Sequence, residues 1–153
     1  MSVTFPMKRV LFLCIGNSCR SQMAEGFARK YGADVMEVGS AGLSPAAIVQ
    51  PQTHEVMSQK NISIEDQFPK DLSSVNVGTY NLIVNMSGVK LPGRIPIEVR
   101  DWKVEDPIGR SEEVYIAVRD QIEAMVMQLV LELRREARRS APPSGSGMAR
   151  RGR

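Results

Sequence analysis

A short apolar segment near the start of the chain leads into a polar loop and then into an amphipathic stretch. Residues 8–14 read Lys-Arg-Val-Leu-Phe-Leu-Cys, the hydrophobic run typical of a strand buried in a parallel sheet. From Arg20 onward, apolar side chains recur at helical spacing as far as Tyr31, and Gly32 is expected to end this helix. A strand that passes through a tight loop into a helix favours an α/β layered fold.

The rest of the chain alternates between strand-like and helical segments. Strands are expected at 35–38, 82–84 and 95–99, helices at about 51–60 and 114–133, and irregular structure at 65–79. Pro96 indicates that the last strand lies at a sheet edge or starts near this residue. The alternation predicts a mostly parallel sheet, with ligands bound beyond the carboxyl ends of its strands.

The composition describes one domain. The chain has 153 residues, of which 42% are hydrophobic, enough for a single core. The predicted domain spans residues 1–139, and residues 140–153 are expected to form a disordered basic tail because they are rich in Pro, Gly, Ser and Arg. Much of the net charge of +3 comes from arginines near the C-terminus, which disfavours a nucleic-acid partner.

Other protein classes are disfavoured by what the sequence lacks. No apolar segment is long enough for a membrane span, and no signal peptide is recognised, so we expect a cytoplasmic protein without a membrane partner. The two cysteines do not make a disulfide framework, and with the single histidine they do not match a zinc spacing. We therefore expect no metal and no cofactor.

The segment from Cys14 to Arg20, Cys-Ile-Gly-Asn-Ser-Cys-Arg, brings several requirements for oxyanion chemistry together. The amides at a helix N-terminus suit a tetrahedral anion, and Gly16 lets the backbone curl so that its amides point inward. The planar guanidinium of Arg20 can hold two oxygens. The same positive field is expected to stabilise a nucleophilic thiolate at Cys14. The alternative for Cys14 is an inert cysteine at the end of a buried strand.

The remaining loop residues are predicted to contact the anion or to support the loop. The predicted substrate-binding residues are Ile15, Gly16, Asn17, Ser18, Cys19 and Ser21. Asn17 is expected to fasten the loop by side-chain hydrogen bonds to its backbone, and Ser21 to donate a hydrogen bond to the Cys14 sulfur. Cys19 could protect Cys14 by forming a reversible disulfide, or could be a small residue that only packs under the loop.

Residues 10–25 resemble the signature of the low-molecular-weight protein tyrosine phosphatases and of the thioredoxin-coupled type of arsenate reductases that share their fold. The resemblance extends over about residues 7–138 and implies a three-layer α/β sandwich around a mostly parallel four-stranded sheet. It implies that Cys14 forms a phosphocysteine, that Arg20 binds the phosphoryl group and that Asp106 is the general acid. Pro107 would stiffen the loop that carries Asp106. Glu105 and Asp101 are nearby rivals for the acid role.

The sequence leaves the reaction open between three possibilities. Thioredoxin-coupled reductases carry two further cysteines after the third strand, whereas residues 82–92 here contain none and Ser87 stands at the first position. For this reason we favour phosphate ester hydrolysis, with phosphotyrosine on a protein or another aryl phosphate as the substrate. The alternative is arsenate reduction with an external small thiol or a redoxin, favoured by Ser18 and by Asp101-Trp102. A non-catalytic oxyanion-binding module is the second alternative.

Overall fold

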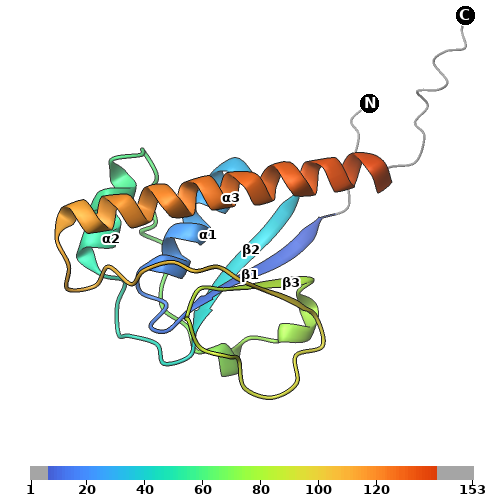
Figure 1. Cartoon of the computed structure of the whole chain (residues 1–153), viewed down its shortest axis with the longest axis horizontal. Coiled ribbons are helices and arrows are strands. Elements are labelled where there is room, and N and C mark those ends of the chain that lie inside the picture. Colours follow the sequence, from blue (N-terminus) through green and yellow to red (C-terminus); the bar gives the residue numbers. More distant parts are fainter. Residues whose placement is uncertain (1–6, 141–153) are drawn as a thin grey trace, which may run out of the picture.

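Four parallel strands form the central sheet. In the computed structural model, which describes residues 7–140, the strands are β1 (Lys8–Cys14), β2 (Met36–Gly42), β3 (Leu82–Asn85) and β4 (Glu98–Asp101). Their order across the sheet is β2-β1-β3-β4, and every neighbouring pair is parallel (Figure 1). The predicted α/β fold with a parallel four-stranded sheet is confirmed, and β1 occupies an inner position with the loop after it at the carboxyl edge.

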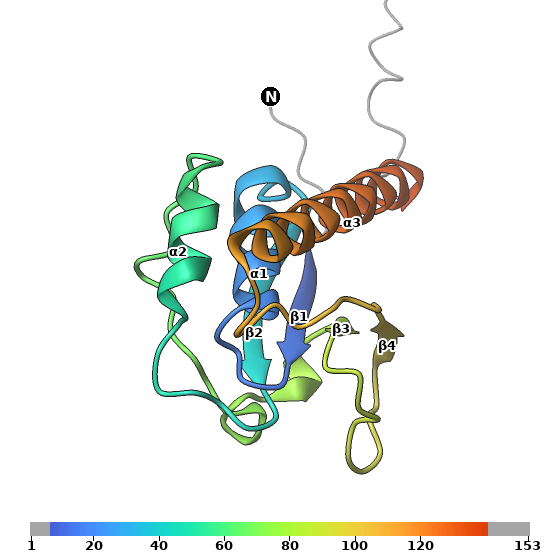
Figure 2. The same ribbon diagram turned by 60° about the vertical axis from the view of Figure 1, so that its left-hand side comes forward.

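Three helices cover one face of this sheet: α1 (Arg20–Tyr31), α2 (Pro51–Ser58) and α3 (Glu112–Ser140). They share a hydrophobic core with Val10 and Phe12 of β1. The helix α3 packs against both α1 and α2 (Figures 1 and 2). The apolar face predicted for the last helix is confirmed, since its central residue Ile122 is fully buried. Among residues 7–140, no helix is long and apolar enough to cross a membrane.

The other face of the sheet is covered by short turns. Leu11 and Leu13 of β1 point to this face and pack with Ile83 of β3. Side chains from two 3-10 turns, η1 (Leu72–Ser74) and η2 (Val77–Thr79), complete this smaller core. The second half of the region 65–79, which was predicted to be irregular, therefore forms the third layer.

Two strand boundaries differ from those expected from the sequence. The last strand was predicted at 95–99 but begins at Glu98, so Pro96 precedes it. Ile95 and Ile97 pack on the smaller core without pairing with β3. Their alternating apolar side chains therefore give the sequence pattern of a strand. The second strand extends to Gly42, well beyond the predicted end at residue 38, because it pairs with the full length of β1.

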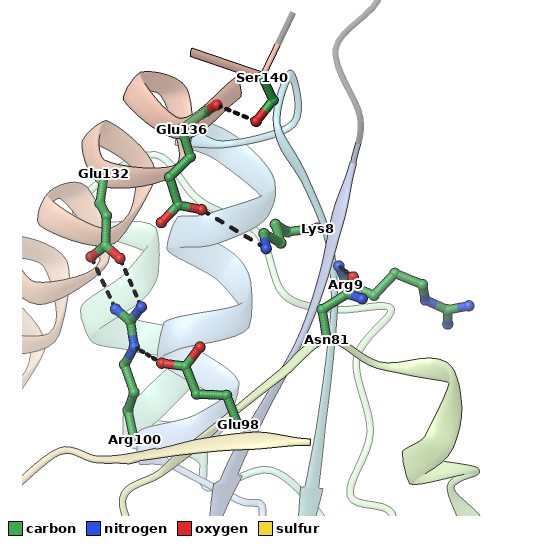
Figure 3. A network of polar contacts seen from close by, with 8 residues as sticks. All are labelled: Lys8, Arg9, Asn81, Glu98, Arg100, Glu132, Glu136 and Ser140. Carbon is green, nitrogen blue, oxygen red and sulfur yellow. Dashed lines mark hydrogen bonds and ion pairs between the residues drawn. The ribbon is translucent and has the colours of Figure 1, made fainter. Parts of the chain in front are cut away.

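A salt bridge ties the edge strand to the long helix. The guanidinium of Arg100 on β4 donates two hydrogen bonds to the Glu132 carboxylate on α3, at 2.9 and 2.7 Å, and also contacts Glu98 (Figure 3). The hydrogen bonds from Arg100 lower the pKa of Glu132. Ser140, the first residue of the predicted basic tail, is the last residue of α3. Residues 141–153 lie outside the described part of the chain.

Candidate active site

The loop between β1 and α1 turns its carbonyl oxygens outward. Four of these oxygens, from residues 14, 15, 16 and 18, accept hydrogen bonds at 2.9–3.2 Å from backbone amides within the segment 43–50. Because a peptide plane directs its N–H opposite to its C=O, the amides of residues 15, 16, 17 and 19 point to the inner side of the loop. Within residues 7–140, the amides of residues 15–19 have no hydrogen-bond acceptor. The loop is thus a ring of free donors at a helix N-terminus, suited to a tetrahedral anion.

Asn17 holds the loop from its centre. It is fully buried and adopts the left-handed backbone conformation, with φ 48°. Its side-chain oxygen accepts a hydrogen bond from the Lys70 amide at 2.8 Å, and its side-chain nitrogen donates to the Ser21 hydroxyl at 2.7 Å. Its carbonyl oxygen accepts from the Gln22 side chain at 2.9 Å. The sequence predicted that Asn17 fastens the loop to its own backbone; its side-chain partners are instead Lys70 and Ser21.

Ser21 contacts the Cys14 sulfur, as expected from the sequence. The Cys14 Sγ and the Ser21 Oγ are 3.0 Å apart, and both residues are buried. Because Asn17 donates to the same hydroxyl oxygen, the hydrogen of Ser21 is free to point at the sulfur. A hydroxyl that donates to sulfur favours the thiolate form.

Arg20 is fixed by the segments that follow β3 and β4. Its Nη1 donates to the carbonyl oxygen of Met86, after β3, at 2.7 Å and to that of Val104, after β4, at 3.1 Å. The residue is only 6% exposed. With Nη1 occupied, Nε and Nη2 remain to hold two oxygens of an anion. Sequence reasoning missed Met86 and Val104 because they act through backbone carbonyls, which every residue type carries.

Asp106 lies at the rim of the same site. Its carboxylate is 49% exposed, and Oδ2 lies 3.7 Å from Nη2 of Arg20. Its Oδ1 accepts a hydrogen bond from the Ile108 amide at 3.1 Å. The rivals have other partners: Glu105 pairs with Arg110, and Asp101 accepts a hydrogen bond from Asn85. Among the carboxylates considered, Asp106 is therefore the one that the structure brings to Arg20.

The end of β2 passes so close to the loop that only glycine fits. A Cβ atom added to Gly42 would lie 2.7 Å from the Ile15 carbonyl oxygen and 2.9 Å from the Asn17 amide nitrogen. Both distances are shorter than Cβ contacts that proteins tolerate without movement of the backbone. Gly42 therefore lets β2 lie against the outer side of the loop.

The remaining predicted loop residues lie in or under the loop. Ile15 and Gly16 are half-buried, whereas Ser18 and Cys19 are buried. Both cysteines are free thiols. Burial raises the pKa of Cys19 to about 12, against a hydrogen bond to Thr53 that lowers it, and the nearby Cys14 raises it further. At neutral pH Cys19 is therefore a protonated and poorly nucleophilic thiol.

The segment after β3 carries Ser87 at the position where the resemblance to thioredoxin-coupled reductases would place a relay cysteine. Ser87 follows Met86 directly and is buried. Its hydroxyl donates to the Asn85 side chain at 2.7 Å and accepts from the Val89 amide at 3.0 Å. Ser87 thus stabilises the turn beside the residue that holds Arg20.

A family model for the low molecular weight phosphotyrosine protein phosphatases matches residues 9–92. The glutaredoxin arsenate reductase of Synechocystis sp. is 38% identical over 83% of this chain and 99% of its own length. Arsenate reductase 1 of Bacillus cereus is 37% identical over 78% of this chain and 91% of its own length.

Solved structures agree with these matches. An arsenate reductase in its phosphate-binding state is 37% identical, with a TM-score of 0.78 over 83% of this chain and 99% of that one. The YwlE arginine phosphatase of Geobacillus stearothermophilus is 23% identical with a TM-score of 0.74 over 88% of this chain and 98% of that one, so it shares the fold. The chain is therefore an enzyme of the low-molecular-weight phosphotyrosine protein phosphatase family.

Proposed function

We propose that the protein reduces arsenate to arsenite with electrons from an external thiol or redoxin. Two observations support this proposal. The loop after β1 and Arg20 form an oxyanion site around Cys14. The chain is also 37–38% identical to arsenate reductases over most of its length. The sequence alone favoured phosphotyrosine hydrolysis. These relatives support the alternative better and reverse that order.

In the proposed first step, the Cys14 thiolate attacks arsenic and one arsenate oxygen leaves as water. The amides of residues 15–19 and the free edge of the Arg20 guanidinium hold the other oxygens. Asp106, at the rim beside Arg20, is placed to protonate the leaving oxygen. The arsenic remains pentavalent in the resulting thioester-like adduct.

In the proposed second step, another thiol attacks the Cys14 sulfur. The sulfur–arsenic bond breaks and its electron pair stays on arsenic, which leaves as trivalent arsenite, while the two sulfurs form a disulfide. Cys19 is the chain's one other cysteine, and it is buried with a pKa of about 12. The attacking thiol is therefore external, and a second thiol then reduces the mixed disulfide.

Phosphate monoester hydrolysis is a second candidate for the same site. It is favoured by Asp106, whose half-exposed carboxylate lies 3.7 Å from Arg20 and could protonate an alkoxide or phenolate leaving group. Arsenate and phosphate have the same shape and charge, so one cradle can accept both. Phosphotyrosine or another aryl phosphate would be the substrate in this case.

The test compares arsenite formation with hydrolysis of p-nitrophenyl phosphate. Wild type with arsenate, glutathione and a glutaredoxin is expected to form arsenite, and Cys14→Ser to lose at least about 1,000-fold of this activity. Cys19→Ser is the matched control, expected to keep activity within about threefold because the Cys19 thiol takes no part. Efficient hydrolysis of the phosphate ester without arsenite formation would overturn the proposal in favour of the phosphatase.

A further inference from the structure

One carbonyl in the loop after β1 is held differently from its neighbours. Asn17 aside, the carbonyl oxygens of residues 14–18 accept hydrogen bonds from backbone amides of the segment 43–50. The carbonyl oxygen of Asn17 instead accepts a hydrogen bond at 2.9 Å from a side chain, the Nε2 amide of Gln22 on α1. The orientation of the peptide group between Asn17 and Ser18 therefore depends on a side chain.

A second glutamine fixes the direction of the Gln22 side-chain amide. Nε2 of Gln67 donates to Oε1 of Gln22 at 2.7 Å and to its main-chain oxygen at 3.1 Å. Nε2 of Gln22 then faces two acceptors, the carbonyl oxygens of Asn17 and, at 3.2 Å, of Phe68. The opposite orientation would set the side-chain oxygen against two other oxygens, so the pair defines which end of the amide meets Asn17. Both glutamines are buried, so solvent does not compete for these contacts.

The direction of the Asn17 carbonyl decides where the Ser18 amide points. The C=O of one residue and the N–H of the next lie on opposite sides of a peptide plane. With the oxygen held by Gln22, the Ser18 N–H points away from Gln22, and it has no acceptor among residues 7–140. Asn17 has a φ of 48°, a region that a non-glycine residue keeps only where its surroundings hold it. The contact with Gln22 is thus one of the restraints that keep this peptide group from turning over.

We propose that Gln22 is a positioning residue for the oxyanion site. Held by Gln67, it fixes the peptide group between Asn17 and Ser18 so that the Ser18 amide donates to the bound anion. The inference rests on the proposed function only through the oxyanion binding that arsenate reduction and phosphate ester hydrolysis share. Gln22 lies outside the loop and acts on the anion through this peptide group. A donor that is already aimed at the anion stabilises it without reorganisation.

The test follows backbone amide resonances of the full chain during titration with inorganic phosphate. In wild type, the amide protons of Gly16, Ser18 and Cys19 are all expected to shift as phosphate binds. Gln22→Met keeps the length of the side chain but removes its donor. In this variant, the shift at Ser18 is expected to fall below about half of its wild-type size, while the other two shifts remain. Phosphate affinity is expected to fall roughly tenfold, as for the loss of one hydrogen bond to a charged group.

Two further variants show whether the effect belongs to the glutamine pair. Gln67→Met leaves the Gln22 amide in place but removes the partner that orients it, and we expect phosphate binding to weaken about threefold. Gln59→Met, the matched control, makes the same change at an exposed position just after α2. It removes a hydrogen bond to Arg119 at 2.8 Å and is expected to leave phosphate affinity within about twofold of wild type.

The outcomes separate the role of Gln22 from the oxyanion site itself. An equal reduction of all three amide shifts in Gln22→Met would indicate general loosening of the loop and would overturn the positioning role. An unchanged Ser18 shift and phosphate affinity in Gln22→Met has the same consequence, as has unchanged binding in Gln67→Met if the first variant does not fold. Absence of any phosphate-dependent shift of the loop amides in wild type overturns the oxyanion site and with it the proposed function.

Discussion

The loops that follow β1 and β3 lie at the same edge of the sheet but are built in opposite ways. The loop after β1 is mostly buried: neighbouring segments bind its carbonyls and the Asn17 side chain, and Asn17 in turn binds Ser21. The loop after β3 is largely exposed: Val89 is 50% exposed, and Gly88 and Gly93 adopt positive φ angles with open space around them. The loop after β1 therefore fixes a geometry for a tetrahedral anion, whereas the loop after β3 is held by fewer contacts.

The comparison separates the two parts of the proposed reaction. Phosphate and arsenate chemistry both need the loop after β1, so that loop alone does not decide between them. The loop after β3 contains no cysteine, so in the proposed reaction the thiol that resolves the adduct on Cys14 comes from outside the chain. The carbonyl of Met86 connects the two loops through Arg20.

Replacing Arg20 with lysine is expected to have the largest effect. An ammonium group cannot hold the Met86 and Val104 carbonyls and two anion oxygens together. The variant therefore loses contacts either to these carbonyls or to the anion. We expect kcat/KM for arsenite formation to fall by about 100-fold. Arg29→Lys, on the same helix, is the matched control and is expected to stay near wild type. A loss of less than fivefold in Arg20→Lys would contradict the role given to the guanidinium.

Two serines allow the loops to be compared directly. Ser21→Ala removes the hydroxyl that contacts the Cys14 sulfur, and we expect alkylation of Cys14 by iodoacetamide at pH 7 to slow by roughly tenfold. Ser87→Ala removes only the turn contacts after β3 and is expected to leave this rate within about twofold. Equal effects of the two variants would show that the sulfur contact does not favour the thiolate.

Two glycines give a smaller contrast. Gly42→Ala pushes a methyl group against Ile15 and Asn17, so we expect a loss of about 1–3 kcal/mol in unfolding free energy and several-fold weaker phosphate binding. Gly88→Ala strains a positive φ angle, at about 1 kcal/mol, without touching the anion loop. Urea unfolding and phosphate titration of both variants measure these effects. Unchanged phosphate affinity in Gly42→Ala would mean that the loop adapts more readily than its contacts indicate.

The smallest effect is expected outside both loops, at the salt bridge between β4 and α3. Arg100→Leu removes the salt bridge to Glu132, which is partly exposed, and we expect a loss of at most about 1 kcal/mol with no change in activity. The pKa of Glu132 is lowered by Arg100, so the pair adds stability above the unfolded carboxyl pKa of about 4.3. This contribution is lost as the pH falls through the folded pKa. Urea unfolding should therefore separate Arg100→Leu from wild type at pH 7 and bring them together near pH 3; a constant difference would rule out the ion pair as its cause.

The sequence predicted the first strand, the loop and the first helix well because their signals are local. The apolar run predicts the strand, Gly16 the tight turn and Arg20 the anion contact, each from residue type alone. The partners of the loop could not be predicted, since Lys70, Met86 and Val104 contribute backbone groups from distant segments. The predicted start of β4 is wrong because Ile95 and Ile97 are partly buried on the smaller core without pairing in the sheet.

The relatives reverse the order of the two candidate reactions, and a physical argument explains why the sequence alone favoured the other order. Residues 82–92 contain no cysteine, which on its own favours phosphate ester hydrolysis over arsenate reduction by an internal thiol relay. A missing internal thiol removes only one source of electrons, because a thiol from solution can attack the same sulfur. In the proposed reaction, the absence means that the second thiol comes from outside the chain, and it does not decide which oxyanion is the substrate.

In the proposed reaction, an external thiol resolves an arsenate adduct on Cys14. The most direct measurement is mass spectrometry of wild type incubated with glutathione, with and without arsenate, in the absence of any redoxin. We expect a glutathione mixed disulfide on Cys14 that appears only with arsenate, while Cys19 stays a free thiol. A Cys14–Cys19 disulfide in its place, or no arsenate-dependent change at Cys14, would contradict resolution by an external thiol.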